Sequence, residues 1–291
     1  MIRVKTALIT GTLLLSSLAL SGHLASAQNA ARPAPAPTPP DVHARVVETV
    51  VDATIPDDQA VDKMLEAYAP KVRALDVLIG KLKGELRKGG IGSGSLGNFV
   101  TDGIREQASL KLGKPVVLAV TNGGGLRKSV MAEGELRERD IFELLPFENA
   151  LVAFDLTGAQ VLDLLRVAVS HRDAQSGARI KYRNAADQTP ELETVRLLIN
   201  GAEKEIDPTA IYTVVSIDYL MNRRSSKPSA TEGDYSILRE AKNIKPIGLT
   251  IRDAMINYVK SETAAGREIR PNLDGRFVFD KSGSATPEQP Q

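Results

Sequence analysis

Apolar residues recur along this chain with two spacings, and each spacing indicates one kind of secondary structure. Between residues 61 and 75 they stand three or four positions apart, which is the spacing of one helix face. Residues 115–120 (PVVLAV) are instead continuously apolar over the length of a buried strand. The pattern predicts helices over 56–75, 96–110, 139–145, 157–170 and 250–260, and strands over 45–53, 77–82, 115–120, 150–156, 194–199 and 212–217.

These elements interleave without the strict alternation of strand and helix that a parallel βαβ fold requires. We therefore expect an α+β fold in which mixed β-sheets are covered by helices. Asn200-Gly201 lies between two strand-like runs and predicts a hairpin turn. We expect a single domain over residues 44–280, an Ala/Pro-rich tether over 28–43 and a disordered tail over 281–291.

The first 27 residues have the order of a secretory signal. Arg3 and Lys5 precede an apolar run of about 15 residues, and Ala25 and Ala27 occupy the positions that a signal peptidase reads. A membrane-spanning helix needs about 20 apolar residues. We therefore expect cleavage after Ala27, no membrane insertion afterwards, and a protein exported to the periplasm or secreted.

Composition excludes several classes of site. The sequence has no Cys, so disulfides, thiolate zinc sites and a cysteine nucleophile are absent. The formal net charge is +1, which does not favour electrostatic capture of nucleic acid. With 42% hydrophobic residues, no Trp and 4% aromatic residues, the chain can build a sizeable core that is mainly aliphatic.

Three consecutive glycines, Gly123, Gly124 and Gly125, directly follow the expected strand at 115–120. A turn without Cβ atoms can adopt positive φ and lets a ligand approach the main-chain N–H groups. Asn122 before the glycines offers an amide, and Arg127 after them offers a planar guanidinium suited to phosphate or carboxylate. Taken alone, the segment is also compatible with a tight structural turn and a solvated arginine.

The segment TNGGGLR and the residues after it resemble the C-terminal domain of the 5'-nucleotidase family. That family has an Asn-Gly-Gly-Gly-(Ile/Leu)-Arg turn, a Leu-Pro-Phe-x-Asn sequence that ends a helix, and a Leu-Thr-Gly-x-x-(Ile/Leu/Val) sequence after a strand. Residues 145–149 (LPFEN) and 156–161 (LTGAQV) match the second and third motifs, and residues 96–102 and 212–215 match two further ones. The resemblance extends over residues 45–275.

The resemblance implies that this domain binds the nucleoside end of a substrate. Asn122 and Arg127 would contact the substrate, and Phe147 and Tyr219 would sandwich the base. Stacking is worth about 1–3 kcal/mol per base. Asp234 would meet the ribose or order the pocket. The alternatives without ligand contact are that Phe147 fills the core behind Pro146 and that Tyr219 packs at a strand end.

The Gly/Ser-rich segment at 89–95 departs from the family pattern. The family has an acid, an amide and an upstream Arg here, and that Arg helps hold phosphate, so the phosphate end of the site is in doubt. Gly92 to Gly97 also matches G-x-G-x-x-G. A dinucleotide site would need an acidic residue about 20 positions further on, where this chain has Thr121 and Asn122, so we reject that interpretation.

Family enzymes are phosphoric monoester hydrolases that use two metal ions held on a separate N-terminal domain. None of their metal-ligand runs occurs in this sequence, whose three histidines are His23, His43 and His171. A two-metal site needs many more ligands. We therefore expect no cofactor or metal in this chain and no phosphatase activity from it alone, with divalent metals confined to a partner.

Three hypotheses follow. The chain is the substrate-recognition half of a split nucleotidase, whose partner would be a separate metallophosphoesterase chain. Alternatively, it is a stand-alone extracytoplasmic module that binds a nucleoside-like or sugar-like small molecule. In the third hypothesis it is a non-catalytic scaffold that has kept the fold and lost the pocket.

Overall fold

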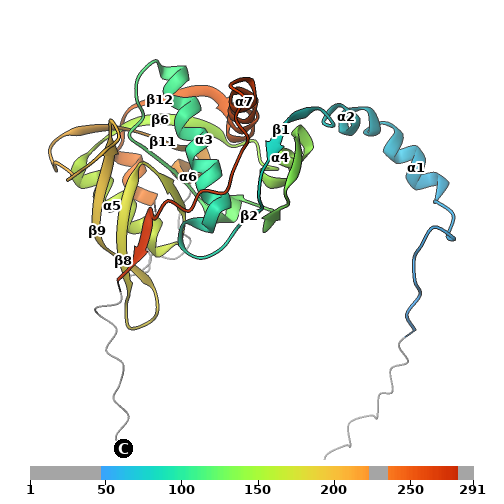
Figure 1. The fold of residues 1–291 in the computed structure, drawn as a ribbon, viewed down its shortest axis with the longest axis horizontal. Coiled ribbons are helices and arrows are strands. Elements are labelled where there is room, and N and C mark those ends of the chain that lie inside the picture. Colours follow the sequence, from blue (N-terminus) through green and yellow to red (C-terminus); the bar gives the residue numbers. More distant parts are fainter. Residues whose placement is uncertain (1–46, 223–234, 281–291) are drawn as a thin grey trace, which may run out of the picture. The chain divides into compact units, whose positions relative to one another are not determined.

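The computed structural model describes residues 47–222 and 235–280 (Figure 1). The chain divides into two units, residues 1–56 and 57–291. Of the first unit, only residues 47–56 are described, and the strand expected over 45–53 does not form there: residues 47–52 are irregular and exposed. The β-branched residues favour extended backbone, but a strand also needs a hydrogen-bonded neighbour. The expected signal (1–27), tether (28–43) and tail (281–291) lie outside the described residues.

A five-stranded mixed sheet with the strand order β12-β6-β11-β3-β7 forms the centre of the second unit. Its strands are β3 (Leu118–Thr121), β6 (Ala150–Thr157), β7 (Ala174–Ser176), β11 (Ile211–Ile217) and β12 (Lys242–Thr250). The β11–β3 pair is parallel and the other pairs are antiparallel. Aliphatic side chains such as Leu118, Leu151 and Val214 are fully buried in this sheet.

A second sheet has four strands in the order β10-β9-β8-β13. They are β8 (Ala178–Asn184), β9 (Pro190–Ile199), β10 (Ala202–Lys204) and β13 (Phe277–Phe279). The expected hairpin joins β9 to β10, and its Asn200 and Gly201 have φ of 53° and 77°, as a tight two-residue hairpin turn requires. Two-stranded pairs are formed by β1 (Leu78–Leu82) with β5 (Gly134–Arg137) and by β2 (Leu86–Arg87) with β4 (Val130–Met131).

Helices cover these sheets, and the expected α+β class is confirmed. The long α3 and α7 pack against each other and both contact β12, whereas α5 contacts β6 and β9 (Figure 1). Thr157 caps α5 reciprocally with Gln160, as the sequence S/T-x-x-Q favours. The helical segments are α3 (Gly94–Leu112), α4 (Glu138–Leu144), α5 (Gly158–Ser170), α6 (Asp218–Asn222), α7 (Ile251–Ala264), η1 (Ile91–Ser93), η2 (Gly123–Gly125) and η3 (Tyr235–Glu240).

The single helix expected over 56–75 is instead two, α1 (Gln59–Glu66) and α2 (Ala69–Ala74). Asp58 caps α1 through the N–H groups of the first turn. Pro70 lacks the N–H that would bond to the carbonyl four residues earlier, so the helix is interrupted before it. Neither helix has a buried residue.

Candidate functional site

The glycine turn begins where β3 ends. Gly125 and Leu126 donate their N–H groups back to the carbonyls of Asn122 and Gly123, at 3.1 and 3.2 Å. None of the three glycines has positive φ, so the turn does not use the left-handed conformations that glycine permits. Gly123 is required for space instead, because a Cβ there would lie 2.4 Å from the Oγ of Ser93.

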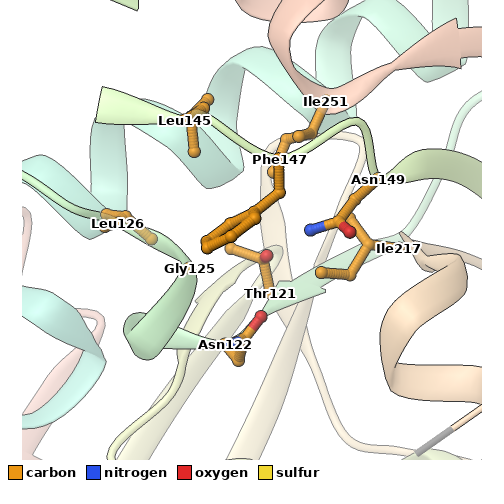
Figure 2. Close-up of a pocket in the computed structure, with 9 residues that line it drawn as sticks. All are labelled: Thr121, Asn122, Gly125, Leu126, Leu145, Phe147, Asn149, Ile217 and Ile251. Carbon is orange, nitrogen blue, oxygen red and sulfur yellow. The ribbon is translucent and has the colours of Figure 1, made fainter. Parts of the chain in front are cut away.

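A small pocket lies beside this turn, and Figure 2 shows nine residues that line it: Thr121, Asn122, Gly125, Leu126, Leu145, Phe147, Asn149, Ile217 and Ile251. They come from the ends of β3, β11 and α4 and from the start of α7. The fold thus gathers the ends of four elements around one point. The cavity has a volume of about 10 Å³, which is space for about one water molecule.

Asn122 carries the clearest chemical signal in the pocket. Its Oδ1 is buried and has no hydrogen-bond partner in the described part of the chain. An unsatisfied buried acceptor costs about 1–3 kcal/mol, and most buried polar groups in native proteins have a partner. A ligand that donates an O–H or N–H group would supply the missing bond.

Phe147 is 47% exposed, so the alternative that it fills the core is wrong. It follows α4 and Pro146, and its ring lies beside Thr121 and Asn122 in Figure 2. The cavity is too small for a nucleobase, whereas the exposed part of the ring offers an apolar surface on which a planar group can stack.

Arg127 lies beside the Phe147 ring. Its Cζ lies 5.7 Å from the centroid of the Phe147 ring, within the range of a cation–π contact. Its Nη1 also donates to the carbonyl of Gly124 at 3.3 Å. Since Arg127 is exposed, it can exchange this weak bond for one to an anionic group of a ligand.

Of the predicted site residues, Asn122, Gly125 and Phe147 line the pocket. Gly123, Gly124 and Arg127 belong to the adjoining turn without lining it, and Tyr219 is not part of either. Tyr219, on α6, is 47% exposed, so it is not packed as a core residue, but it is not among the residues that line the pocket. Its neighbour two positions earlier, Ile217, is. Asp234 lies outside the described residues.

Sequence reasoning missed two polar residues of the pocket, Thr121 and Asn149. Asn149 stands two positions after Phe147, inside the LPFEN motif, and its side chain faces the pocket in Figure 2. Its amide can both donate and accept hydrogen bonds. The signal that could have identified it was a polar residue placed between an exposed aromatic and the first residue of β6.

The nine lining residues include no His, Asp, Glu, Lys or Arg. In the described ranges, no group of three or more His, Cys, Asp or Glu side chains is placed to hold a metal ion. These residues do not suit a two-metal phosphatase centre. Their amides, hydroxyl and ring, with Arg127 beside them, suit the binding of a polar molecule that has a flat face.

The Gly92–Gly97 pattern does not form a dinucleotide site. It follows β2, a two-residue strand in an antiparallel pair, rather than the parallel strand of a βαβ unit. Ser93 and three neighbouring glycines there have positive φ. The segment is a compact turn that leads into α3.

Comparisons with known proteins agree with this description of fold and site. The chain matches the family described as "5'-nucleotidase, C-terminal domain" over residues 74–228. It is 29% identical over 181 residues to a 5'-nucleotidase of Vibrio vulnificus, covering 60% of this chain and 31% of that protein. It is 27% identical over 206 residues to the trifunctional nucleotide phosphoesterase protein YfkN of Bacillus subtilis, covering 66% and 13%.

Solved structures show the same similarity. The 5'-nucleotidase precursor from Thermus thermophilus superposes with a TM-score of 0.63 at 26% identity, covering 78% of this chain and 44% of that one. The NAD nucleotidase of Haemophilus influenzae, at 19% identity and a TM-score of 0.55, shares the fold. In each of these comparisons the chain spans less than half the length of its relative.

Proposed function

This chain belongs to the family of 5'-nucleotidase C-terminal domains, and from that membership we propose that it recognises a nucleoside or nucleotide. It would act in nucleotide catabolism as the substrate-binding half of a split 5'-nucleotidase. The observation that carries the proposal is the pairing of an unsatisfied buried acceptor, Asn122 Oδ1, with the half-exposed ring of Phe147 in one pocket.

The ligand would stack its base on Phe147 and donate a hydrogen bond to Asn122. Arg127, 5.7 Å from the ring centroid, would face the more polar end of the ligand. Asn149 would add a second amide for base or sugar. Tyr219 and Asp234 stay in the proposal as a second aromatic surface and a contact to the ribose.

The hydrolytic step would take place on a separate metallophosphoesterase chain. The proposal is supported by the residues that line the pocket, which provide binding groups but no acid, base or metal ligand.

We also propose that the chain is exported, with cleavage after Ala27. One relative, at 28% identity, is the cell wall protein Lmo0130 of Listeria monocytogenes. None of the helices in the described ranges combines the length and the apolar character that a bilayer crossing requires. Intact-mass measurement on protein from the extracytoplasmic fraction tests the cleavage, because a mass that retains residues 1–27 contradicts it.

The alternative of a non-catalytic scaffold is favoured by one observation, the cavity volume of about 10 Å³. Calorimetric titration of the purified chain with adenosine, AMP, ribose and inorganic phosphate separates a scaffold from the two binding functions, the split-enzyme half and the stand-alone module. We expect adenosine and AMP to bind, and ribose and phosphate alone to leave no signal, because stacking requires the base. If neither adenosine nor AMP binds, the scaffold function stands.

A phosphatase assay tests whether hydrolysis requires a separate chain. Purified chain with Mn²⁺, Zn²⁺ or Ca²⁺ should release no phosphate from AMP. The split-enzyme proposal fails if phosphate is released in a metal-dependent way and the release is lost in Arg127→Ala, since the chemistry would then reside in this chain.

A further inference from the structure

A buried carboxylate connects the glycine turn to the last part of the chain. The Oδ1 of Asp173 accepts the N–H of Gly123 at 2.8 Å, and its Oδ2 accepts the hydroxyl of Tyr235 at 2.7 Å. Asp173 is 5% exposed and Tyr235 is fully buried. One side chain thus joins the turn after β3 to the first residue of η3.

The strand register explains why Asp173 stands there. In the antiparallel pair of β3 and β7, Thr121 is opposite Ala174. The residue after β3 and the residue before β7 are therefore neighbours, and these are Asn122 and Asp173. The Asp173 backbone is itself held by its N–H, which donates to the carbonyl of Ala168 in α5 at 2.8 Å.

Ser93 lies close to the same glycine. The Oγ of Ser93 lies 2.4 Å from the position that a Cβ on Gly123 would take. Ser93 has a φ of 59°, and the neighbouring Gly92 donates its N–H to the carbonyl of Arg172 at 3.2 Å. Ser93 therefore leaves no room for a side chain at position 123, and Asp173 holds the Gly123 N–H.

The two sides of the turn differ in their hydrogen bonds. On the inner side, the N–H of Gly123 bonds to a carboxylate, and such charge-assisted bonds are roughly twice as strong as neutral ones. On the pocket side, the Oδ1 of Asn122 has no partner in the described part of the chain. The protein completes the bonds that hold the turn and leaves open the one that a ligand would use.

We infer that Asp173 and Tyr235 are positioning residues, which fix the orientation of Asn122 and of the Gly124 and Gly125 backbone toward the pocket without contacting the ligand. The inference rests on the proposed function for its ligand, but the geometry of the turn can be measured without one. A burial role alone would not need this geometry, because a neutral apolar side chain fills space without the desolvation cost of a carboxylate.

Three variants separate the two bonds. Asp173→Ala removes both, Tyr235→Phe removes the hydroxyl alone, and Asp173→Asn keeps an oxygen that can accept the Gly123 N–H. Asp155→Ala is the control, because Asp155 also accepts two hydrogen bonds, here from the side chains of Thr213 and Asn243, each at 2.9 Å, and it lies in β6 of the five-stranded sheet. The readouts are the backbone amide resonances of Gly123, Gly124 and Gly125 in ¹H–¹⁵N spectra, and adenosine affinity by calorimetry.

We expect Asp173→Ala to shift all three glycine amides and to weaken adenosine binding about tenfold, the scale of one lost hydrogen bond to a charged group. Tyr235→Phe should shift the same amides with a smaller loss of affinity. Asp173→Asn should restore most of both, and Asp155→Ala should change neither.

A folded Asp173→Ala protein whose Gly124 and Gly125 amides are unshifted overturns the inference. If that variant does not fold, Tyr235→Phe decides in the same way, since it removes one oxygen atom and leaves the ring in place. If the unaltered chain does not bind adenosine, the proposed function fails. The shifts of the Gly123, Gly124 and Gly125 amide resonances then decide by themselves whether Asp173 positions the turn.

Discussion

Buried polar groups lie near both ends of β7, and they differ in how fully they are hydrogen-bonded. At one end, the 5% exposed guanidinium of Arg276 donates two bonds to Asp102, both at 2.9 Å, and two to Asp274, at 2.9 and 3.0 Å. It also donates to the carbonyl of Gln175 in β7 at 3.1 Å. At the other end, Asn122 lies beside the start of β7 with its buried Oδ1 unpaired within the described residues.

This difference separates stability from function in one fold. A buried charge is tolerated when its donors are satisfied, and the Arg276 network meets that condition while tying α3 and β13 to β7. A buried acceptor without a partner lowers stability, so its retention indicates a use outside the folded chain. The comparison predicts that changes in the Arg276 network affect folding, and that changes around Asn122 affect binding.

The largest expected effect is on folding. Arg276→Ala removes the cation that the half-buried Asp102 and Asp274 share, although Asp274 keeps its ion pair with Arg179 at 3.1 Å. We therefore expect the unfolding free energy to fall by about 1.5–3 kcal/mol, the scale of hydrogen bonds to charged groups. Urea denaturation followed by circular dichroism measures this. Arg270→Ala is the control, because Arg270 is 61% exposed and its bond to Glu268 is 3.4 Å long, and it should change stability by less than about 0.5 kcal/mol. Equal losses in the two variants would remove the structural half of the comparison.

The next effect is on binding. Phe147→Ala removes the exposed ring and should weaken adenosine binding by about 1–3 kcal/mol, with little change in the urea midpoint because the ring is already half in water. Phe279→Ala is the matched control: Phe279 is 38% exposed but contacts Tyr182 in the four-stranded sheet. The assignment is contradicted if Phe147→Ala lowers stability by about 3–5 kcal/mol, as truncation of a core phenylalanine does, and leaves adenosine binding unchanged.

A smaller effect is confined to acid. Burial raises the pKa of Asp274, but the hydrogen bond and the positive charge of Arg276 outweigh it, so this pKa lies below its usual value. A carboxyl whose folded pKa is depressed contributes stability above the unfolded pKa, about 3.9, and loses it as pH falls through the folded pKa. We therefore expect the unfolding free energy to decrease below about pH 4.

Asp274→Asn tests the origin of that decrease. The variant should be less stable than the natural chain at neutral pH, and its stability should depend less on pH below about 4. Stability curves against pH from urea titrations measure both. An unchanged acid dependence would assign the effect to other carboxyls.

The sequence predicted elements whose signals are local. The capping residues Thr157 and Gln160, the hairpin at Asn200-Gly201 and the glycine turn each act within a few residues, and each stands in the structure where expected. Strands that need a distant partner were less predictable. Residues 45–53 have strand composition without a partner, whereas β7, β8 and β12 have short or mixed patterns and were not expected, although neighbouring strands stabilise them.

The candidate site divides in the same way. Asn122, the glycines, Arg127 and Phe147 were found because they lie in motifs, and the fold brings them together. Asp173 was not found, because its importance depends on the register that sets Thr121 opposite Ala174. Three-dimensional pairing of this kind leaves no periodic signal in the sequence.

The smallest expected effect tests the comparison most directly. Asn122→Ala removes an acceptor that has no partner among residues 47–222 and 235–280, so we expect no loss of a hydrogen bond on folding and a urea midpoint that stays the same or rises slightly. Adenosine affinity should fall by about 0.5–1.5 kcal/mol, the net worth of one hydrogen bond. Thr213→Ala is the opposite case, because the Thr213 hydroxyl donates to Asp155 at 2.9 Å, and it should cost stability without affecting binding. If Asn122→Ala instead destabilises the fold as Thr213→Ala does, then the Asn122 side chain is hydrogen-bonded within the native protein, and the binding proposal loses the acceptor on which it depends.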